Sequence, residues 1–318
     1  MHSRLGDESV RTVLVALAAN VIAALAKTAV ALVTGSTAMS AEAAQAFADT
    51  GNQVLLLVAQ RRSGRPADER HPLGYGRDAY FWALIASVGV FVTGALFSLR
   101  EGIVELVHPT KAGSFLAAYL VLAVAAALDF VSLVQAMRQL RSEARSLQRD
   151  LLAHLQLTSD PTARAVFAEN AAAFLGDVVA ALGVALHEAT GSSAPDGIAA
   201  VLIGLLVAGV GVQLARRNHD FLLGEPVAES TRARVETFLR QFPGVEDVRE
   251  LVVTFVGPRQ VRVLARVDVD DNLRGDEVER LVTSIAEGLE QESEFVVRVD
   301  VVPVGRPAPG TGTAATSS

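Results

Sequence analysis

The sequence predicts two parts: an α-helical membrane domain with six spans, and a small α+β domain that follows it. Hydrophobic residues make up 51% of the chain, and the mean hydropathy is +0.36. Six apolar segments each approach the ~20 residues that a helix needs to cross a bilayer. Beyond about residue 225 the pattern changes to short amphipathic and β-branched runs, which are typical of an α+β domain.

The six predicted spans are separated by loops that differ in charge. They are Thr12–Thr34, Ser40–Gln60, Ala79–Leu99, Ser114–Met137, Arg164–Leu186 and Asp196–Leu214. Arginines gather in the loops after spans two, four and six: Arg61, Arg62, Arg65, Arg70, Arg77, Arg138, Arg141, Arg145, Arg149, Arg216 and Arg217. Basic loops stay in the cytoplasm, and an even number of spans returns the chain to its starting side. Both termini are therefore expected in the cytoplasm.

The second part contains five predicted elements in the order αββαβ. They are a helix over Thr231–Gln241, strands over Val248–Val256 and Gln260–Val269, a helix over Asp276–Leu289, and a strand over Phe295–Val302. The dipeptide Gly257-Pro258 between the first two strands indicates a hairpin. The predicted division is therefore a flexible N-terminus (1–9), a membrane domain (10–217), a cytoplasmic domain (225–304) and a disordered tail (305–318).

Composition excludes several classes of function. The chain has no cysteine and six histidines, none of them beyond His219, which excludes disulfide, iron–sulfur and thiolate zinc sites. It contains no Ser/His/Asp set, phosphate-binding loop or redox motif, so an enzyme is not expected. The net charge of −7 gives no sign of a nucleic-acid partner. Abundant alanine and a large excess of arginine over lysine are typical of a prokaryotic plasma-membrane protein.

Two carboxylates lie deep within predicted spans. Asp49 is nine residues into span two, and Asp177 lies at a similar distance from the outer end of span five, so both are ~13 Å below the outer surface. A charge at membrane depth costs roughly 2.5–3.5 kcal/mol on insertion scales and marks a functional site by default. Two acids at one depth indicate a shared cation. The alternative is a structural role, with bonds to Asn20, Asn52 or Lys27.

An ordered set of motifs then carries a family resemblance. It comprises Gly35-Ser36, Ala41-Glu42-Ala43, Ala48-Asp49-Thr50-Gly51-Asn52-Gln53, Arg65-Pro66-Ala67-Asp68, His71-Pro72-Leu73-Gly74-Tyr75-Gly76-Arg77 and Asp160-Pro161-Thr162. In this topology the chain resembles a cation diffusion facilitator. The resemblance implies a ferredoxin-like cytoplasmic domain, a homodimer in a lipid bilayer, and export of a divalent metal (zinc, manganese or iron) in exchange for protons.

The resemblance also implies a central metal site made by two residues on span two and two on span five. The matching positions here are Gln45 and Asp49, and Ala173 and Asp177. Alanine offers no ligand, so the site is rich in oxygen and harder than the His/Asp sites that zinc prefers. Glu169, one turn before Ala173, has two interpretations: it replaces the lost ligand, or it is stabilised by the positive end of its helix.

Other polar positions complete the prediction. Asp68 and His71 resemble the family's second, cytoplasmic metal site, although Tyr75 stands where a later histidine is expected; the alternative is that these residues shape an interfacial loop. A third, histidine-based site in the cytoplasmic domain is expected to be absent. Lys27 and Glu42 are expected to form a structural ion pair, Asn20 and Asn52 to bond between helices, and Asp129 has no assigned partner. The alternative function is a non-transporting partner subunit of the same fold.

Overall fold

The computed structural model describes residues 17–18, 21–109, 115–146, 150–151, 158–293 and 295–305, the side chains of residues 90 and 91 excepted. Segment 1–9 and nearly all of the tail 305–318, both predicted to be flexible, lie outside the described residues. The chain divides into two compact units, Met1–Leu222 and Leu223–Ser318.

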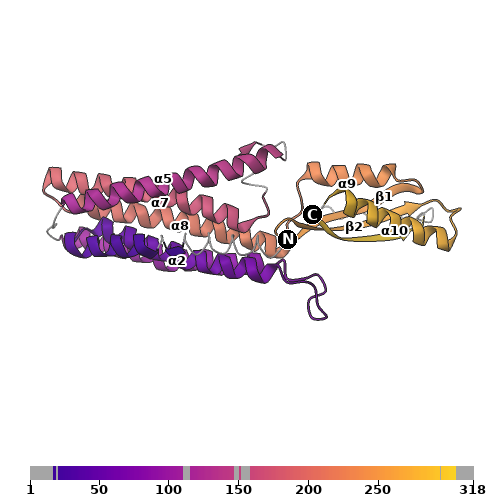
Figure 1. Ribbon diagram of the computed structural model, residues 1–318, viewed down its shortest axis with the longest axis horizontal. Coiled ribbons are helices and arrows are strands. Elements are labelled where there is room, and N and C mark those ends of the chain that lie inside the picture. Colours follow the sequence, from indigo (N-terminus) through magenta and orange to yellow (C-terminus); the bar gives the residue numbers. More distant parts are fainter. Residues whose placement is uncertain are drawn as a thin grey trace, which may run out of the picture. The chain divides into compact units, whose positions relative to one another are not determined.

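The first unit is helical (Figure 1). A helix over Val21–Thr34 is followed by α2 (Thr37–Ser63), α3 (Asp78–Val90), η1 (Phe91–Ala95), α4 (Leu96–Val107), α5 (Phe115–Ser146), α7 (Pro161–Thr190) and α8 (Ala194–Leu223). The short π-helix η1 joins α3 to α4, so that the three form one continuous rod, Asp78–Val107.

Four of these helical segments are long and apolar enough to cross a membrane. They are Asp78–Val107, Phe115–Arg145, Pro161–Thr190 and Ala194–Leu223. Four of the six predicted spans are thus confirmed as apolar helices. Each of the four helices is longer than its predicted span, and only Phe115–Arg145 begins later than predicted. The described part of span one, Val21–Thr34, is shorter. Span two is the 27-residue helix α2, which is long enough but too polar because it carries Glu42, Gln45 and Asn52.

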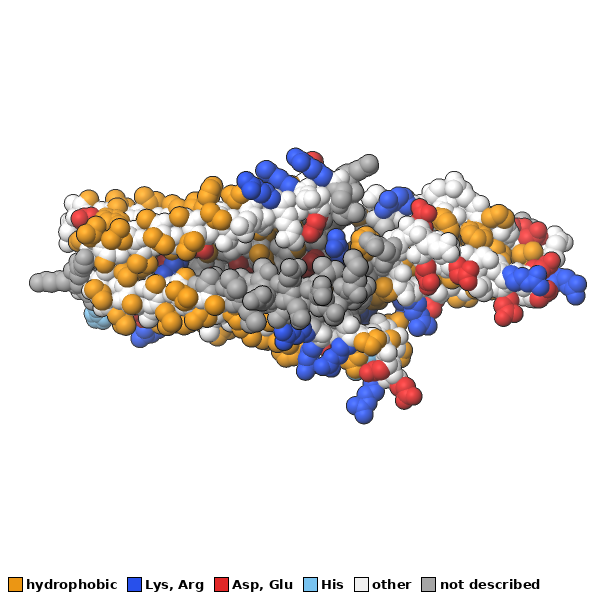
Figure 2. All heavy atoms as spheres, viewed as in Figure 1, with side chains coloured by type: hydrophobic (Ala, Val, Ile, Leu, Met, Phe, Trp, Pro, Cys, Tyr) orange, Lys and Arg blue, Asp and Glu red, His pale blue; other side chains and the backbone are white. Residues whose placement is uncertain are grey.

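Small side chains fill the interior of the helical unit. Alanines from α2, α5, α7 and α8 are buried, among them Ala41, Ala118, Ala180 and Ala200. A Cβ atom added at Gly102 of α4 would lie 2.7 Å from the carbonyl oxygen of Gly197 in α8. Such close backbone approach is typical of helices that associate in lipid. Many large apolar side chains are exposed, and hydrophobic side chains are spread over much of the visible face of the unit in Figure 2.

The second unit is a three-stranded sheet with two helices. It contains α9 (Glu229–Gln241), β1 (Val245–Gly257), β2 (Gln260–Val269), α10 (Gly275–Glu292) and β3 (Val296–Val304). The strand order is β1-β2-β3; β1 and β2 are antiparallel, and β2 and β3 are parallel. A parallel pair needs a crossover connection, which α10 supplies. The predicted αββαβ order is confirmed.

The core of the second unit lies between its helices and one face of its sheet. Alternate residues of the central strand β2 are fully buried, including Val263 and Ala265, and they meet Leu239 of α9 and Ile285 of α10. This alternation follows the two-residue period of a strand that is covered on one side.

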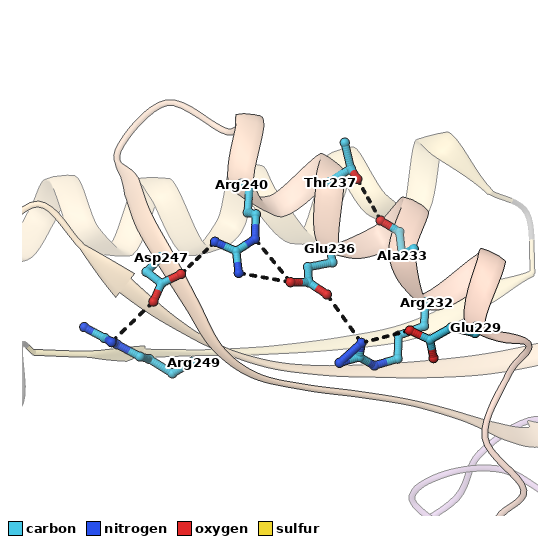
Figure 3. Close-up of polar contacts among 8 residues, drawn as sticks. All are labelled: Glu229, Arg232, Ala233, Glu236, Thr237, Arg240, Asp247 and Arg249. Carbon is cyan, nitrogen blue, oxygen red and sulfur yellow. Dashed lines mark hydrogen bonds and ion pairs between the residues drawn. The ribbon is translucent and has the colours of Figure 1, made fainter. Parts of the chain in front are cut away.

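A chain of ion pairs runs along α9 and onto β1 (Figure 3). Arg232 bridges Glu229 and Glu236 along the helix, and Arg240 pairs with Glu236 at 3.0 Å. Arg240 Nη1 also donates to Asp247 Oδ1 of β1 at 2.7 Å. This hydrogen bond holds the pKa of Asp247 below its ordinary value. Exposed pairs of this kind contribute little to stability, so they align α9 more than they stabilise the unit.

We expect a fragment covering residues 223–305 to fold alone, since its core is complete within it. In that fragment Ile285→Ala should lower the free energy of unfolding by about 2–5 kcal/mol, because it opens a cavity at a fully buried position. Val302→Ala is the control, since Val302 is 42% exposed. Urea unfolding followed by circular dichroism measures both. Equal losses from the two substitutions would show that this core does not hold the fragment together.

Candidate metal centre

A tight turn places the start of α2 beside the preceding helix. Gly35 adopts a left-handed φ of 64°, a conformation that glycine takes without strain. The Ser36 hydroxyl then accepts the backbone N–H of Met39 and caps α2. Lys27 lies eight residues before Gly35 and Glu42 seven residues after it. In two helices joined by so short a turn, these two side chains reach the same level.

The start of α7 is set by an N-cap. Asp160 Oδ1 accepts the backbone N–H groups of Thr162 and Ala163 at 2.9 and 3.2 Å. Pro161 occupies the first turn, where its missing N–H would have had no partner in any case. The motif Asp160-Pro161-Thr162 therefore begins the helix, and the rest of α7 carries Glu169 and Asp177 along one side of α2.

Lys27 is the centre of a buried ionic cluster. Its Nζ donates to Asp177 Oδ1 at 2.7 Å and to Glu42 Oε2 at 2.9 Å, and it lies 3.9 Å from Asp129 Oδ2. The side chains of Lys27, Glu42 and Asp177 are at most 6% exposed. The predicted ion pair of Lys27 and Glu42 is present, and Asp177 joins it. Asp129, which had no assigned partner, faces the same ammonium group.

Asp49 belongs to the neighbouring part of this polar interior. Its carboxylate is hydrogen-bonded by the side-chain amide of Gln45 and interacts electrostatically with Lys27 and Asp129. Gln45 is buried and Asp49 half-buried. Gln45 and Asp49, four residues apart on α2, therefore lie on the same inward face of that helix, as their spacing predicts. A cation shared by Asp49 and Asp177 is a proposal, taken up below.

Glu169 is engaged with α2 rather than with its own helix end. Asn52 Nδ2 donates to Glu169 Oε1, and both side chains are buried. Glu169 also interacts electrostatically with Asp49. Because α7 begins at Pro161, Glu169 lies in its third turn, whereas the helix dipole acts within the first. The helix-end interpretation therefore does not account for it. Asn52 forms the predicted bond between helices; Asn20 lies outside the described residues.

The carboxylates of this interior approach one another closely. Glu42 and Asp129 both lie near enough to Asp177 to share a hydrogen bond if one of the pair carried a proton. Ionised carboxylates only accept hydrogen bonds, so such contacts are repulsive without a cation or proton between them. No group of three or more His, Asp or Glu side chains within the described ranges is arranged to hold a metal ion. Ala173 contributes only a methyl group.

The loop between α2 and α3 brings Asp68, His71 and Tyr75 together. Asp68 Oδ1 accepts the backbone N–H groups of Arg70 and His71, and Oδ2 accepts the Tyr75 hydroxyl at 2.7 Å. The tyrosine hydrogen bond holds the pKa of Asp68 below its ordinary value. The His71 and Tyr75 rings lie 4.2 Å apart. Both oxygens of Asp68 thus serve the loop, which favours the loop-shaping interpretation over a metal site.

Sequence reasoning missed two features of the interior. It placed Glu42 in a pair with Lys27 but not beside Asp177. It also missed how α2 is anchored: Asp196 of α8 accepts the Ser36 hydroxyl at 3.0 Å and the Thr37 N–H at 2.8 Å. An acid at the first turn of an apolar helix was the available signal for Asp196. Nothing local in the sequence could have shown that Glu42 faces α7.

Comparison with known proteins follows the same division of the chain. Residues 13–223 match the family model described as the cation efflux transmembrane domain. The proton-coupled zinc antiporter SLC30A9 of Xenopus laevis, a mitochondrial protein, is 32% identical over 260 residues, which are 82% of this chain and 46% of that protein. Metal tolerance protein C4 of Arabidopsis thaliana is 27% identical over 267 residues, 84% of this chain and 58% of that protein.

Bacterial relatives are also present. The cation-efflux pump FieF of Escherichia coli is 25% identical over 243 residues, 76% of this chain and 74% of that protein. The chain therefore spans about half the length of the first relatives and about three quarters of FieF. A solved MamM CTD structure aligns with 24% of this chain and 94% of its own, at 18% identity and a TM-score of 0.23.

Proposed function

The chain belongs to the cation efflux, or cation diffusion facilitator, family, and from this premise we propose that it exports a divalent metal cation through its helical unit in exchange for protons. The family is one of membrane transporters rather than enzymes. The observation that carries the proposal is the buried Lys27, Glu42 and Asp177 cluster. Charged groups at membrane depth face protein interiors and mark ion pathways, and here two carboxylates already hold one cation.

The proposed mechanism is alternating access with six spans and cytoplasmic termini. Metal enters from the cytoplasm, binds carboxylate oxygens that include Asp49 and Asp177, and leaves on the opposite side as protons replace it. Metal and protons compete for the same oxygens because a ligand must be deprotonated to bind. That competition is the physical basis of exchange. Glu169 and Gln45 supply further oxygens nearby, and the C-terminal unit, which lacks Cys and His, serves as a dimerisation module.

The metal is proposed to be zinc, manganese or iron. Oxygen donors favour harder cations than histidine does. This supports manganese or iron as well as zinc, the metal named for the relative SLC30A9. The proposed membrane is a prokaryotic plasma membrane.

Flux into proteoliposomes tests the function. Purified full-length protein should accumulate at least one of Zn²⁺, Mn²⁺ and Fe²⁺ against empty liposomes, and collapse of an imposed pH gradient should slow the accumulation. Fluorescent metal indicators inside the vesicles follow each ion separately. If none of the three metals crosses while the protein is correctly reconstituted, the alternative of a non-transporting partner subunit stands instead.

A further inference from the structure

Three buried carboxylate or amide oxygen atoms of α2 and α7 have no hydrogen-bond partner among the residues that the structure describes. They are Glu42 Oε1 and Gln45 Oε1 of α2, and Asp177 Oδ2 of α7. The residues are at most 2% exposed. A buried acceptor without a partner loses its hydration and gains nothing in return, so three in one interior need an explanation.

Two of these oxygens, those of Glu42 and Gln45 on α2, converge over Gly176 of α7. A Cβ atom added at Gly176 would collide with Glu42 Oε1 and would lie 3.2 Å from Gln45 Oε1. Asp177, the next residue, brings its carboxylate to Glu42. Glycine at position 176 is therefore what allows the α2 oxygens to reach α7. The side-chain amide of Gln45 is hydrogen-bonded to Asp49, which leaves Gln45 Oε1 directed at Gly176.

Lys27 occupies the other side of the same two carboxylates. It binds Glu42 through Oε2 and Asp177 through Oδ1, and it leaves Oε1 and Oδ2 unpaired. Each carboxylate therefore offers one oxygen to the ammonium group and keeps one buried oxygen without a partner in the described structure. One ammonium group and two carboxylates carry a net charge of −1, so a second cation at this position is electrostatically favoured.

We propose that Glu42 is a metal ligand, which with Asp177 and Gln45 forms an all-oxygen pocket over Gly176, and that the Lys27 ammonium group is the resident cation that holds this pocket when metal is absent. The inference rests on the proposed function, since it concerns the exported ion. An oxygen-only donor set suits hard divalent cations. Lys27 is a positioning residue: it keeps two like charges together and weakens metal binding enough for release.

The charge of Lys27 makes the proposal testable. Lys27→Met should tighten binding of Mn²⁺ and of Zn²⁺, each added alone, at least tenfold at pH 8, because it removes a cation that competes for the same carboxylates. It should also slow flux, because release becomes harder. Glu42→Gln should weaken binding at least tenfold. Lys27→Arg keeps the positive charge and should bind metal with the wild-type affinity. Titration calorimetry on the full chain in detergent measures these affinities.

Glu105→Gln is the matched control. Glu105 is a buried acid of the same unit that accepts the hydroxyl of Thr37, the first residue of α2, at 2.8 Å, and its loss should leave metal affinity unchanged. A purely structural Lys27 would lower thermal stability in Lys27→Met without tightening metal binding. Affinity in Lys27→Met that equals or falls below wild type therefore overturns the role given to Lys27, and wild-type affinity in Glu42→Gln overturns that of Glu42.

A second measurement needs no substitution at the pocket. The chain has two lysines, Lys27 and Lys111, so side-chain ¹⁵N-lysine NMR gives two signals, which Lys111→Arg assigns. Saturating Zn²⁺ should shift the Lys27 signal, since the metal takes the oxygens that the ammonium group contacts; an unmoved signal contradicts the proposal even if Lys27→Met does not fold.

The outcomes separate the two proposals. Wild-type protein that neither binds nor transports metal refutes the proposed function as well as this inference. Normal wild-type transport with unaffected variants refutes this inference alone.

Discussion

Asp177→Asn is expected to abolish metal transport, with flux at least 100-fold below wild type. Asp177 contacts the Lys27 ammonium group at 2.7 Å and is fully buried, and it is the acid through which α7 meets the ionic cluster. Asparagine keeps the shape but removes the charge that a divalent cation needs. Asp49→Asn should have the same result, because Asp49 is the acid that α2 contributes one turn after Gln45. Flux in proteoliposomes at matched protein content measures both.

Removal of one partner from a buried ion pair also affects stability. Such losses amount to about 3–5 kcal/mol in proteins, so size-exclusion profiles and thermal unfolding must accompany the flux data. Glu188→Gln is the control on the same helix, since Glu188 is exposed and its carboxylate accepts a hydrogen bond from the Tyr119 hydroxyl at 2.7 Å. It should transport as wild type does. A folded Asp177→Asn protein with wild-type flux would remove Asp177 from the pathway.

Gln45→His is expected to shift metal preference toward zinc, with the zinc-to-manganese flux ratio rising at least tenfold. Gln45 Oε1 is buried without a partner in the described structure, so a ligand at this position faces the pocket. Imidazole nitrogen suits Zn²⁺ better than Mn²⁺, which prefers oxygen. Paired fluxes in the same vesicle preparation give the ratio directly.

The control for metal preference is the same change elsewhere on α2. Gln60 is exposed near the end of that helix, so Gln60→His adds an imidazole without placing it in the interior. It should leave the zinc-to-manganese ratio as in wild type. An unchanged ratio in Gln45→His as well would show that position 45 does not touch the ion.

Much of the architecture followed from local patterns. Apolar length alone predicts the helices α5, α7 and α8, because a membrane helix satisfies all its backbone hydrogen bonds within itself. The two-residue alternation of β2 and the turn at Gly257-Pro258 predict the hairpin of the second unit, and the αββαβ order was confirmed. The polar helix α2 shows the limit of this reasoning: its interior acids and amides lower its hydropathy, so composition alone does not mark it as a span.

The sequence by itself also predicted the pair of Lys27 and Glu42, which lie eight residues before and seven residues after Gly35 in neighbouring helices. Only the tertiary structure decided that Asp177, 150 residues from Lys27, completes this pair, and that Asn52 meets Glu169. The physical reason is that hydropathy fixes which segments are helices but not how each helix is rotated or shifted against its neighbours. Those two variables are set by packing, here by the close approach that Gly176 permits, and they decide which carboxylates share one cation.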